Sequence, residues 1–177
     1  MLQEYHTLKT LQLFFDEPTK EHYLMEISKR TNLAHTSTKE NLINLKNKNF
    51  IIETKEKKGK RIFPIYKTNL DNQEFKFYKK IFNLLNLEES GLITFIYDKT
   101  SPNSIILFGS YSRGEDIEES DIDLFVQTKE QTLNLEKFER LLHRKIHLHF
   151  KQKLSDYPNE LKLNLLNGTV LRGYVEI

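Results

Sequence analysis

The chain has 177 residues, of which 38% are hydrophobic and 29% are charged. This balance is typical of a folded protein with a core and argues against a disordered chain. Cysteine is absent, so the sequence excludes both a disulfide framework and a zinc site built on thiolates. Because neither a signal-peptide pattern nor a run of 18 apolar residues is present, we expect a cytoplasmic protein that does not enter a membrane.

The net charge of +2 hides an asymmetry along the chain. Residues 1–70 carry 13 Lys and Arg against 8 Asp and Glu, which gives +5, whereas residues 71–177 carry 14 against 17, which gives −3. A basic first part favours contact with nucleic acid, and an acidic second part favours the collection of cations.

The first part of the chain predicts helices followed by a hairpin. Apolar residues at helical spacing predict three helices, over residues 5–15, 21–30 and 36–48. Asn32 suits a left-handed turn between the second helix and the third. Two β-favouring runs follow, at residues 50–54 and 61–66, with Gly59 in the polar loop between them.

This order resembles a winged helix-turn-helix domain of the MarR and ArsR type. The segment "LMEISKRTNLAHTSTKENLINLKNKNFI" carries the resemblance, which covers residues 1–68. It implies that the third helix enters the major groove of double-stranded DNA while the hairpin, or wing, follows the phosphates. The expected DNA-contacting residues are His35, Thr36, Ser37, Lys39 and Asn44 on the helix, and Lys57, Lys58, Lys60 and Arg61 on the wing. The alternative is the same fold used for protein contacts, with lysines that keep the hairpin tip soluble.

Residues 69–103 predict two connecting helices separated by Gly91. Phe75, Tyr78, Phe82 and Leu85 follow helical spacing and form an aromatic stripe, which Phe77, Ile81 and Leu84 widen. We interpret this stripe as buried structure, packed on a neighbouring part of the chain or across a homodimer.

The segment "NSIILFGSYSRGEDIEESDIDLFVQT" predicts a strand, a polar turn and a second strand. Gly109 permits a close backbone approach, and Ser110 opens a single helical turn whose amide and hydroxyl suit a phosphate. Asp121 and Asp123 alternate with apolar residues, so they share one face of a strand, roughly 6.6 Å apart. Carboxylates at that separation suit divalent cations, which neutralise triphosphate charge and orient displacement at phosphorus. The alternative is that Asp121 and Asp123 lie at a solvated acidic end of the strand. We expect the acidic loop residues 115–119 to be solvated in either case.

The same segment resembles the minimal nucleotidyltransferases of the DNA polymerase β superfamily. Their signature is Gly-Ser, ten residues, then Asp-x-Asp, matched here by Gly109, Ser110, Asp121 and Asp123. The resemblance implies an α+β chain with a small mixed-sheet nucleotidyltransferase domain over residues 104–177. It also implies that Gly109, Ser110 and Arg113 bind the phosphates of a nucleoside triphosphate, ATP foremost, and that the two aspartates bind Mg²⁺.

The activity that the resemblance implies is transfer of a nucleoside monophosphate to a hydroxyl group of a protein or nucleic acid. In this family such domains serve as antitoxins that modify a partner toxin, often a HEPN-type nuclease. A DNA-binding domain beside such an enzyme suits a regulator of its own promoter, by analogy of fold alone.

The sequence departs from the family pattern in "RKIHLHF", residues 144–150, where His147 replaces the expected third carboxylate. The expected catalytic residues are therefore Asp121, Asp123 and His147, with His149 on the same face of the strand. An imidazole can act as a base near neutral pH, but it holds magnesium poorly. Three interpretations stay open: an active enzyme with a modified base, a nucleotide binder without turnover, and a domain kept for folding and dimerisation. The last two describe a transcription regulator rather than an enzyme.

Overall fold

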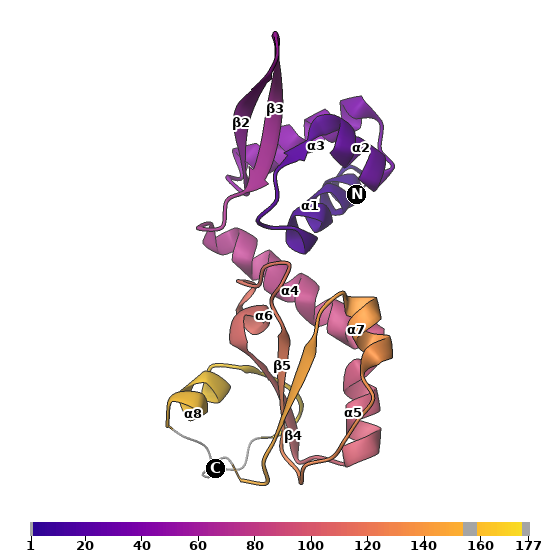
Figure 1. Ribbon diagram of the computed structural model, residues 1–177, viewed down its shortest axis with the longest axis vertical. Helices are drawn as coiled ribbons and strands as arrows, with labels where there is room; N and C mark the ends of the chain where they lie inside the picture. Colours follow the sequence, from indigo (N-terminus) through magenta and orange to yellow (C-terminus); the bar gives the residue numbers. More distant parts are fainter. Residues whose placement is uncertain (1, 154–158, 175–177) are drawn as a thin grey trace. The chain divides into compact units, whose positions relative to one another are not determined.

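The computed structural model of the protein describes residues 2–153 and 159–174. It contains two compact units, residues 1–76 and 77–177 (Figure 1). The segment 69–103, which we expected to connect two domains, is thus shared between the units. In the part of the chain that the structure describes, no helix is long and apolar enough to cross a membrane.

The first unit consists of helices followed by a hairpin, with one short strand between the first two helices. Its elements are α1 (Leu2–Asp16), β1 (His22–Tyr23), α2 (Leu24–Thr31), α3 (His35–Asn47), β2 (Ile51–Lys58), β3 (Arg61–Thr68) and the start of α4 (Gln73–Ser90). The strands form an antiparallel sheet in the order β1-β3-β2. We did not predict β1, whose two residues pair with Tyr66 and Ile65 of β3.

Apolar faces at helical spacing build the core of this unit. Helix α3 buries Thr38, Leu42 and Leu45, the positions that its period predicts. Asn32 ends α2 in the left-handed conformation, as expected. The ring of Phe75, from the first turn of α4, lies 5.1 Å from that of Phe15 and 6.1 Å from that of Phe50. Burial of each such ring contributes about 1.5–3 kcal/mol.

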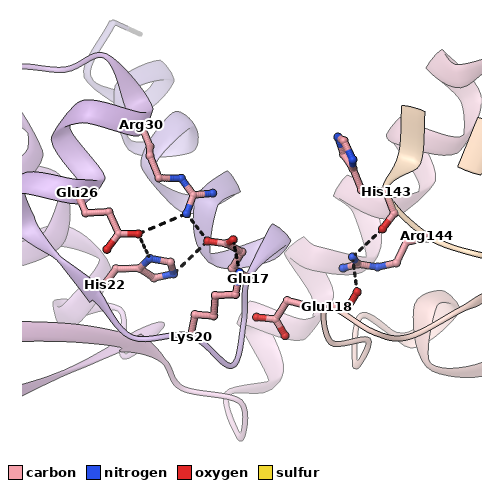
Figure 2. Close-up of polar contacts among 8 residues, drawn as sticks. All are labelled: Glu17, Lys20, His22, Glu26, Arg30, Glu118, His143 and Arg144. Carbon is pink, nitrogen blue, oxygen red and sulfur yellow. Dashed lines mark hydrogen bonds and ion pairs between the residues drawn. The ribbon is translucent and has the colours of Figure 1, made fainter. Parts of the chain in front are cut away.

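A cluster of charged side chains lies beside this core (Figure 2). Oε1 of Glu17 accepts a 2.6 Å hydrogen bond from Lys20, and Oε2 accepts one from Arg30. Nε2 of the buried His22 lies 3.8 Å from Oε2. Burial alone would raise the pKa of the Glu17 carboxyl, but the hydrogen bonds and charges of Arg30 and Lys20 outweigh it and lower this pKa below its ordinary value of 4.5. The ionised carboxylate therefore stabilises the folded unit.

Replacement of Glu17 by Gln should lower the stability of the first unit in a pH-dependent way. A depressed carboxyl pKa contributes stability that is present above 4.5 and is lost as the pH falls through the folded-state value. The difference in unfolding free energy between wild type and variant should therefore be largest near pH 7 and shrink below pH 4. Urea unfolding across this range measures it, with the exposed neighbour Glu21→Gln as control. Equal differences at every pH would contradict the ion-pair account.

The second unit is a four-stranded mixed sheet with helices. Its elements are the rest of α4, α5 (Leu92–Thr100), β4 (Ser104–Phe108), α6 (Gly109–Arg113), β5 (Ile122–Val126), α7 (Glu136–Leu142), β6 (Ile146–Phe150), α8 (Asn159–Leu166) and β7 (Thr169–Gly173). The strand order is β6-β5-β4-β7, with β5 and β6 parallel and the other pairs antiparallel. A mixed sheet in this part of the chain is what the sequence predicted.

Both faces of the sheet are covered, which explains the continuous apolar run of β4. On one face, Ile105 and Leu107 join a core with α4, α5 and α7. On the other, Ile106 and Phe108 pack with Phe125 and with Leu165 of α8. Side chains of a strand alternate between faces, so the odd-numbered residues of β5 share the second face.

The aromatic stripe that we predicted to be buried is only partly so. Phe75 is buried, but Phe77 is 58% exposed and Leu85 is 55% exposed. The buried face of α4 instead runs through Phe75, Lys79, Asn83 and Leu87, which recur every four residues. Because a lysine and an asparagine lie in the middle of that face, the spacing of apolar residues did not predict its burial.

Candidate functional site

The turn after β4 brings the Gly-Ser motif against the second aspartate. Gly109 has a left-handed φ of 75°, and a Cβ atom placed on it would lie only 2.7 Å from Oδ2 of Asp123. Antiparallel pairing of Phe108 with Asp123 fixes this approach. Glycine is therefore required both for its conformation and for its lack of a side chain.

The two aspartates lie on one side of β5. Asp121 immediately precedes the strand and Asp123 is within it, while the intervening Ile122 is buried on the opposite face. Their side chains are 41% and 29% exposed, so both carboxylates reach solvent. This is not a freely solvated strand end, because Leu124 and Phe125 continue the strand into the core.

Strand β6 places two histidines beside the carboxylates. Its parallel register pairs His147 with Asp123. The Nδ1 atom of His147 lies 3.7 Å from Oδ2 of Asp121 and 4.0 Å from Oδ1 of Asp123. The Nε2 atom of His149 lies 3.5 Å from Oδ1 of Asp123, and its ring packs edge-on against Phe108. Two carboxylates and two imidazoles thus face one another at the edge of the sheet.

This donor set fits a divalent cation in part. Within the described residues, no three His, Asp or Glu side chains are placed to hold a metal ion by themselves. Mg²⁺ is usually bound by one or two carboxylates together with substrate phosphates and water, rather than by a cage of protein ligands. Asp121 and Asp123 satisfy that lesser requirement, and the imidazoles do not add oxygen ligands.

The other expected phosphate-binding residues lie on α6. Ser110 is half-buried in this short helix, next to Gly109. Gly114 ends the helix in the left-handed conformation. Arg113 is exposed, and its Nε donates a 2.7 Å hydrogen bond to Glu115 of its own loop. Its role at a phosphate stays a prediction.

An open cavity of about 550 Å³ adjoins the first aspartate, and sequence reasoning did not anticipate it. Its lining combines acidic and basic side chains from Glu118, Glu119, Ser120, Asp121, Glu136, Glu139, Arg140, His143, Arg144 and Lys145. The hydrogen bond from Lys145 lowers the pKa of the Glu139 carboxyl, and Glu139 raises the pKa of the Lys145 ammonium. The cavity therefore offers polar and charged contacts next to the carboxylates.

The loop between the two motifs differs from the expectation of a solvated segment. Asp116 is fully buried and accepts hydrogen bonds from Lys79 and Asn83 of α4, both at 2.7 Å. No local pattern identifies these residues, because the partners are 37 and 33 positions apart. The remaining acidic residues of the loop are exposed or half-buried, in line with the expectation.

In the first unit, the expected DNA-contacting residues lie on α3 and on the β2–β3 hairpin. His35 is the first residue of α3, and Lys58 pairs with Arg61 across the hairpin turn. Lys58 also lies 4.4 Å from the centre of the Tyr23 ring and 3.2 Å from Glu56. Apart from the half-buried Ser37, all the expected residues are exposed: His35, Thr36, Lys39, Asn44, Lys57, Lys58, Lys60 and Arg61.

Comparison with known proteins relates the second unit to a known family. Residues 91–173 match the family model described as Polymerase beta, Nucleotidyltransferase. Among curated proteins, the chain is 61% identical over 33 residues to the "Putative protein adenylyltransferase" of Methanocaldococcus jannaschii. That alignment covers 19% of this chain and spans 33%, about a third, of the relative. No solved structure matches the chain.

Replacement of Gly109 by Ala should lower the free energy of unfolding of the second unit. The loss should exceed that of the same replacement at a left-handed glycine with open space around it. Any alanine in the left-handed region costs about 1–2 kcal/mol, and at Gly109 the new methyl group must also displace the Asp123 carboxylate. The matched control is Gly59→Ala, whose φ of 63° is similar and whose Cβ would meet nothing within 4 Å. Urea unfolding of both variants measures the difference, and equal losses would contradict the close approach.

Proposed function

We propose that the second unit binds a nucleoside triphosphate with a divalent cation and transfers its nucleoside monophosphate to a hydroxyl group. The observation that best supports this proposal is that the Gly109 backbone, the carboxylates of Asp121 and Asp123 and the His147 side chain lie together at one edge of the sheet. The family match of residues 91–173 supports nucleotidyl transfer in general.

In the proposed reaction, the acceptor oxygen attacks the α-phosphorus and the bond from this phosphorus to the bridging oxygen breaks, so that pyrophosphate leaves. Asp121 and Asp123 would hold the cation, which neutralises triphosphate charge when bound. Gly109 and Ser110 would bind the phosphates. A Cβ atom at Gly109 would lie 2.7 Å from Oδ2 of Asp123, so any larger residue would displace that carboxylate.

We propose that the His147 imidazole accepts the proton that the acceptor hydroxyl group loses. This side chain is 56% exposed, so it is accessible to an acceptor, and a neutral imidazole is a competent base near neutral pH. The imidazolium formed would face carboxylates 3.7 and 4.0 Å away, and opposite charges at such distances attract. The adjoining cavity beside Asp121 would receive the acceptor.

The name of the Methanocaldococcus jannaschii relative supports ATP as the nucleotide and a protein as the acceptor. A HEPN-type toxin is the protein acceptor that the antitoxin resemblance favours. A homodimer is a further proposal, supported by the exposed apolar side chains of α4 at Phe77, Ile81 and Leu85.

Incubation with labelled ATP, GTP, CTP or UTP and Mg²⁺, with and without the product of the neighbouring gene, tests this function. We expect label from ATP on a protein acceptor. Asp121→Asn and Asp123→Asn should each lower nucleotide binding in the presence of Mg²⁺ at least tenfold, because each removes a carboxylate ligand. Calorimetry with Glu119→Gln as the matched exposed control measures that loss. Unchanged affinity in both variants would refute the metal-site assignment.

A transcription regulator that binds nucleotide without turnover is the second candidate, favoured by the imidazole in place of a third carboxylate. His147→Asp separates the two functions. If His147 is the base of an active enzyme, the variant should change the pH dependence of transfer. If the site has lost turnover, nucleotide should bind in the wild type without any labelled acceptor.

For the first unit, we propose binding to double-stranded DNA through α3 and the β2–β3 hairpin. The order of three helices and a hairpin supports a winged helix-turn-helix, and the sheet order β1-β3-β2 is compatible with it. Exposure of His35, Thr36, Lys39 and Asn44 leaves α3 accessible to a groove. The exposed cations of the hairpin suit phosphates.

Removal of the cations at the hairpin tip should weaken DNA binding in a salt-dependent way. The variant replaces Lys57, Lys60 and Arg61 by Ala, and three lost phosphate contacts should reduce the slope of log affinity against log salt by about 2–3. A matched variant removes three exposed lysines of the second unit, Lys99, Lys129 and Lys151. Fluorescence anisotropy with a labelled duplex measures both. Equal slopes in all three proteins would refute the assignment of the hairpin.

A further inference from the structure

We propose that Lys79 and Asn83 of α4 are positioning residues for the nucleotide site, acting through the buried carboxylate of Asp116. They hold the loop that runs from the Gly-Ser motif to the first aspartate. The consequence for nucleotide binding rests on the function proposed above, whereas the order of the loop itself does not.

The contacts are direct and reach both oxygens of the carboxylate. Lys79 Nζ donates to Oδ2 of Asp116, and Asn83 Nδ2 donates to Oδ1, each at 2.7 Å. Asn83 Nδ2 also donates to the carbonyl oxygen of Tyr111 at 2.9 Å. Because Tyr111 follows Ser110 directly, the same amide ties α4 to the helical turn expected to bind phosphate.

A second cation joins Asp116 to the histidine strand. Arg144 Nη2 lies 3.7 Å from Oδ2 of Asp116. Its Nη1 donates a 2.8 Å hydrogen bond to the Glu118 carbonyl oxygen, as Figure 2 shows. Arg144 lies three residues before His147. Asp116 and the Asn83 amide thus link α4, α6, the 114–121 loop and the segment that leads into β6. Apart from Asp123 in β5, the expected residues of the nucleotide site lie on α6, in this loop and on β6.

The burial of this network indicates that it fixes the position of the 114–121 loop. Lys79 and Asp116 are each 1% exposed, and removing two such charges from water costs several kcal/mol before their attraction offsets it. Well-packed apolar side chains would often stabilise the same place equally well. What an apolar pair cannot do is fix a polar loop in one position by directed hydrogen bonds.

Apolar packing contributes little to the placement of this loop. Ile117 is its only aliphatic residue from 114 to 121, and it is 40% exposed. The sheet and its helices, by contrast, share a continuous apolar core that includes Leu87 of α4. Loss of the network should therefore disturb the loop before it disturbs the sheet.

The inference also extends the functional unit beyond the family match. That match begins at residue 91, after both positioning residues. The second compact unit, which begins at residue 77, contains them. On this view α4 is a working part of the nucleotide site.

The test compares Lys79→Met with the double variant Lys79→Met, Asp116→Asn in the full chain. Hydrogen exchange by mass spectrometry follows the peptide 109–121, calorimetry follows binding of Mg²⁺-ATP, and thermal unfolding follows stability. In Lys79→Met we expect at least tenfold faster exchange in 109–121, at least tenfold weaker nucleotide binding and a lower unfolding midpoint. The double variant removes the buried carboxylate that Lys79→Met leaves without its lysine, while Arg144 keeps its hydrogen bond to the Glu118 carbonyl oxygen. It should therefore recover part of the midpoint but neither the loop protection nor the affinity.

Two further variants keep the test decisive. Asn83→Ala breaks the link to Tyr111 while leaving the ion pair, so it should speed exchange in 109–121 with a smaller loss of stability, even if Lys79→Met does not fold. Lys80→Met, one residue from the network and half-buried, is the control and should leave all three measurements unchanged.

The outcomes separate this inference from the proposed function. Exchange in 109–121 that is unchanged in Asn83→Ala and in the double variant, or that rises equally throughout the second unit, would overturn the positioning role. Full recovery of loop protection by the double variant would also overturn it, because the network would then serve stability alone. Absence of nucleotide binding in the wild type would instead refute the proposed function, while the exchange data would still decide the inference.

Discussion

The approach of the Gly109 backbone to the Asp123 carboxylate is the constraint on which the candidate site depends. It follows from one register, the pairing of Phe108 with Asp123 between β4 and β5. A slip of one residue would turn Asp123 into the apolar core and expose its neighbours. The buried residues on both faces of these strands prevent that slip, so packing of the sheet and geometry of the site have the same physical cause.

Carboxylates and imidazoles gather at this edge of the sheet, where we propose that phosphates bind. Two carboxylates face two imidazoles, and the separations of 3.5–4.0 Å are too long for strong hydrogen bonds but short enough for the groups to influence one another. A cation on the aspartates and a proton on a histidine would compete for the same negative charge. The identity of the residue at position 147 therefore matters more than any other single position for distinguishing an enzyme from a binding protein.

Much of this arrangement was predictable because it depends on short-range rules. The alternation of Asp121, Ile122 and Asp123 fixes which side chains share a face, and the same rule places His147 with His149. Gly114 and Asn32 adopt left-handed conformations that their residue types favour. These features require no knowledge of distant partners.

The features that escaped prediction all depend on pairing across the chain. Strand β1 has two residues and exists only through its bonds to β3. Asp116 sits among other acidic residues and looks solvated until Lys79 is brought to it. Phe77 and Leu85 fit a buried stripe by spacing, but the face of α4 that is buried is the one carrying Lys79 and Asn83. Tertiary contacts, not local preference, selected that face.

The division of α4 has a consequence for how the two units can be inherited or exchanged. Phe75 completes the aromatic core of the first unit, and Lys79, one helical turn later, completes the second. Recombination at a loop on either side of this helix would deprive one unit of a core side chain. An exchange of either unit would therefore have to carry its own part of α4, Phe75 with the first unit and Lys79 with the second.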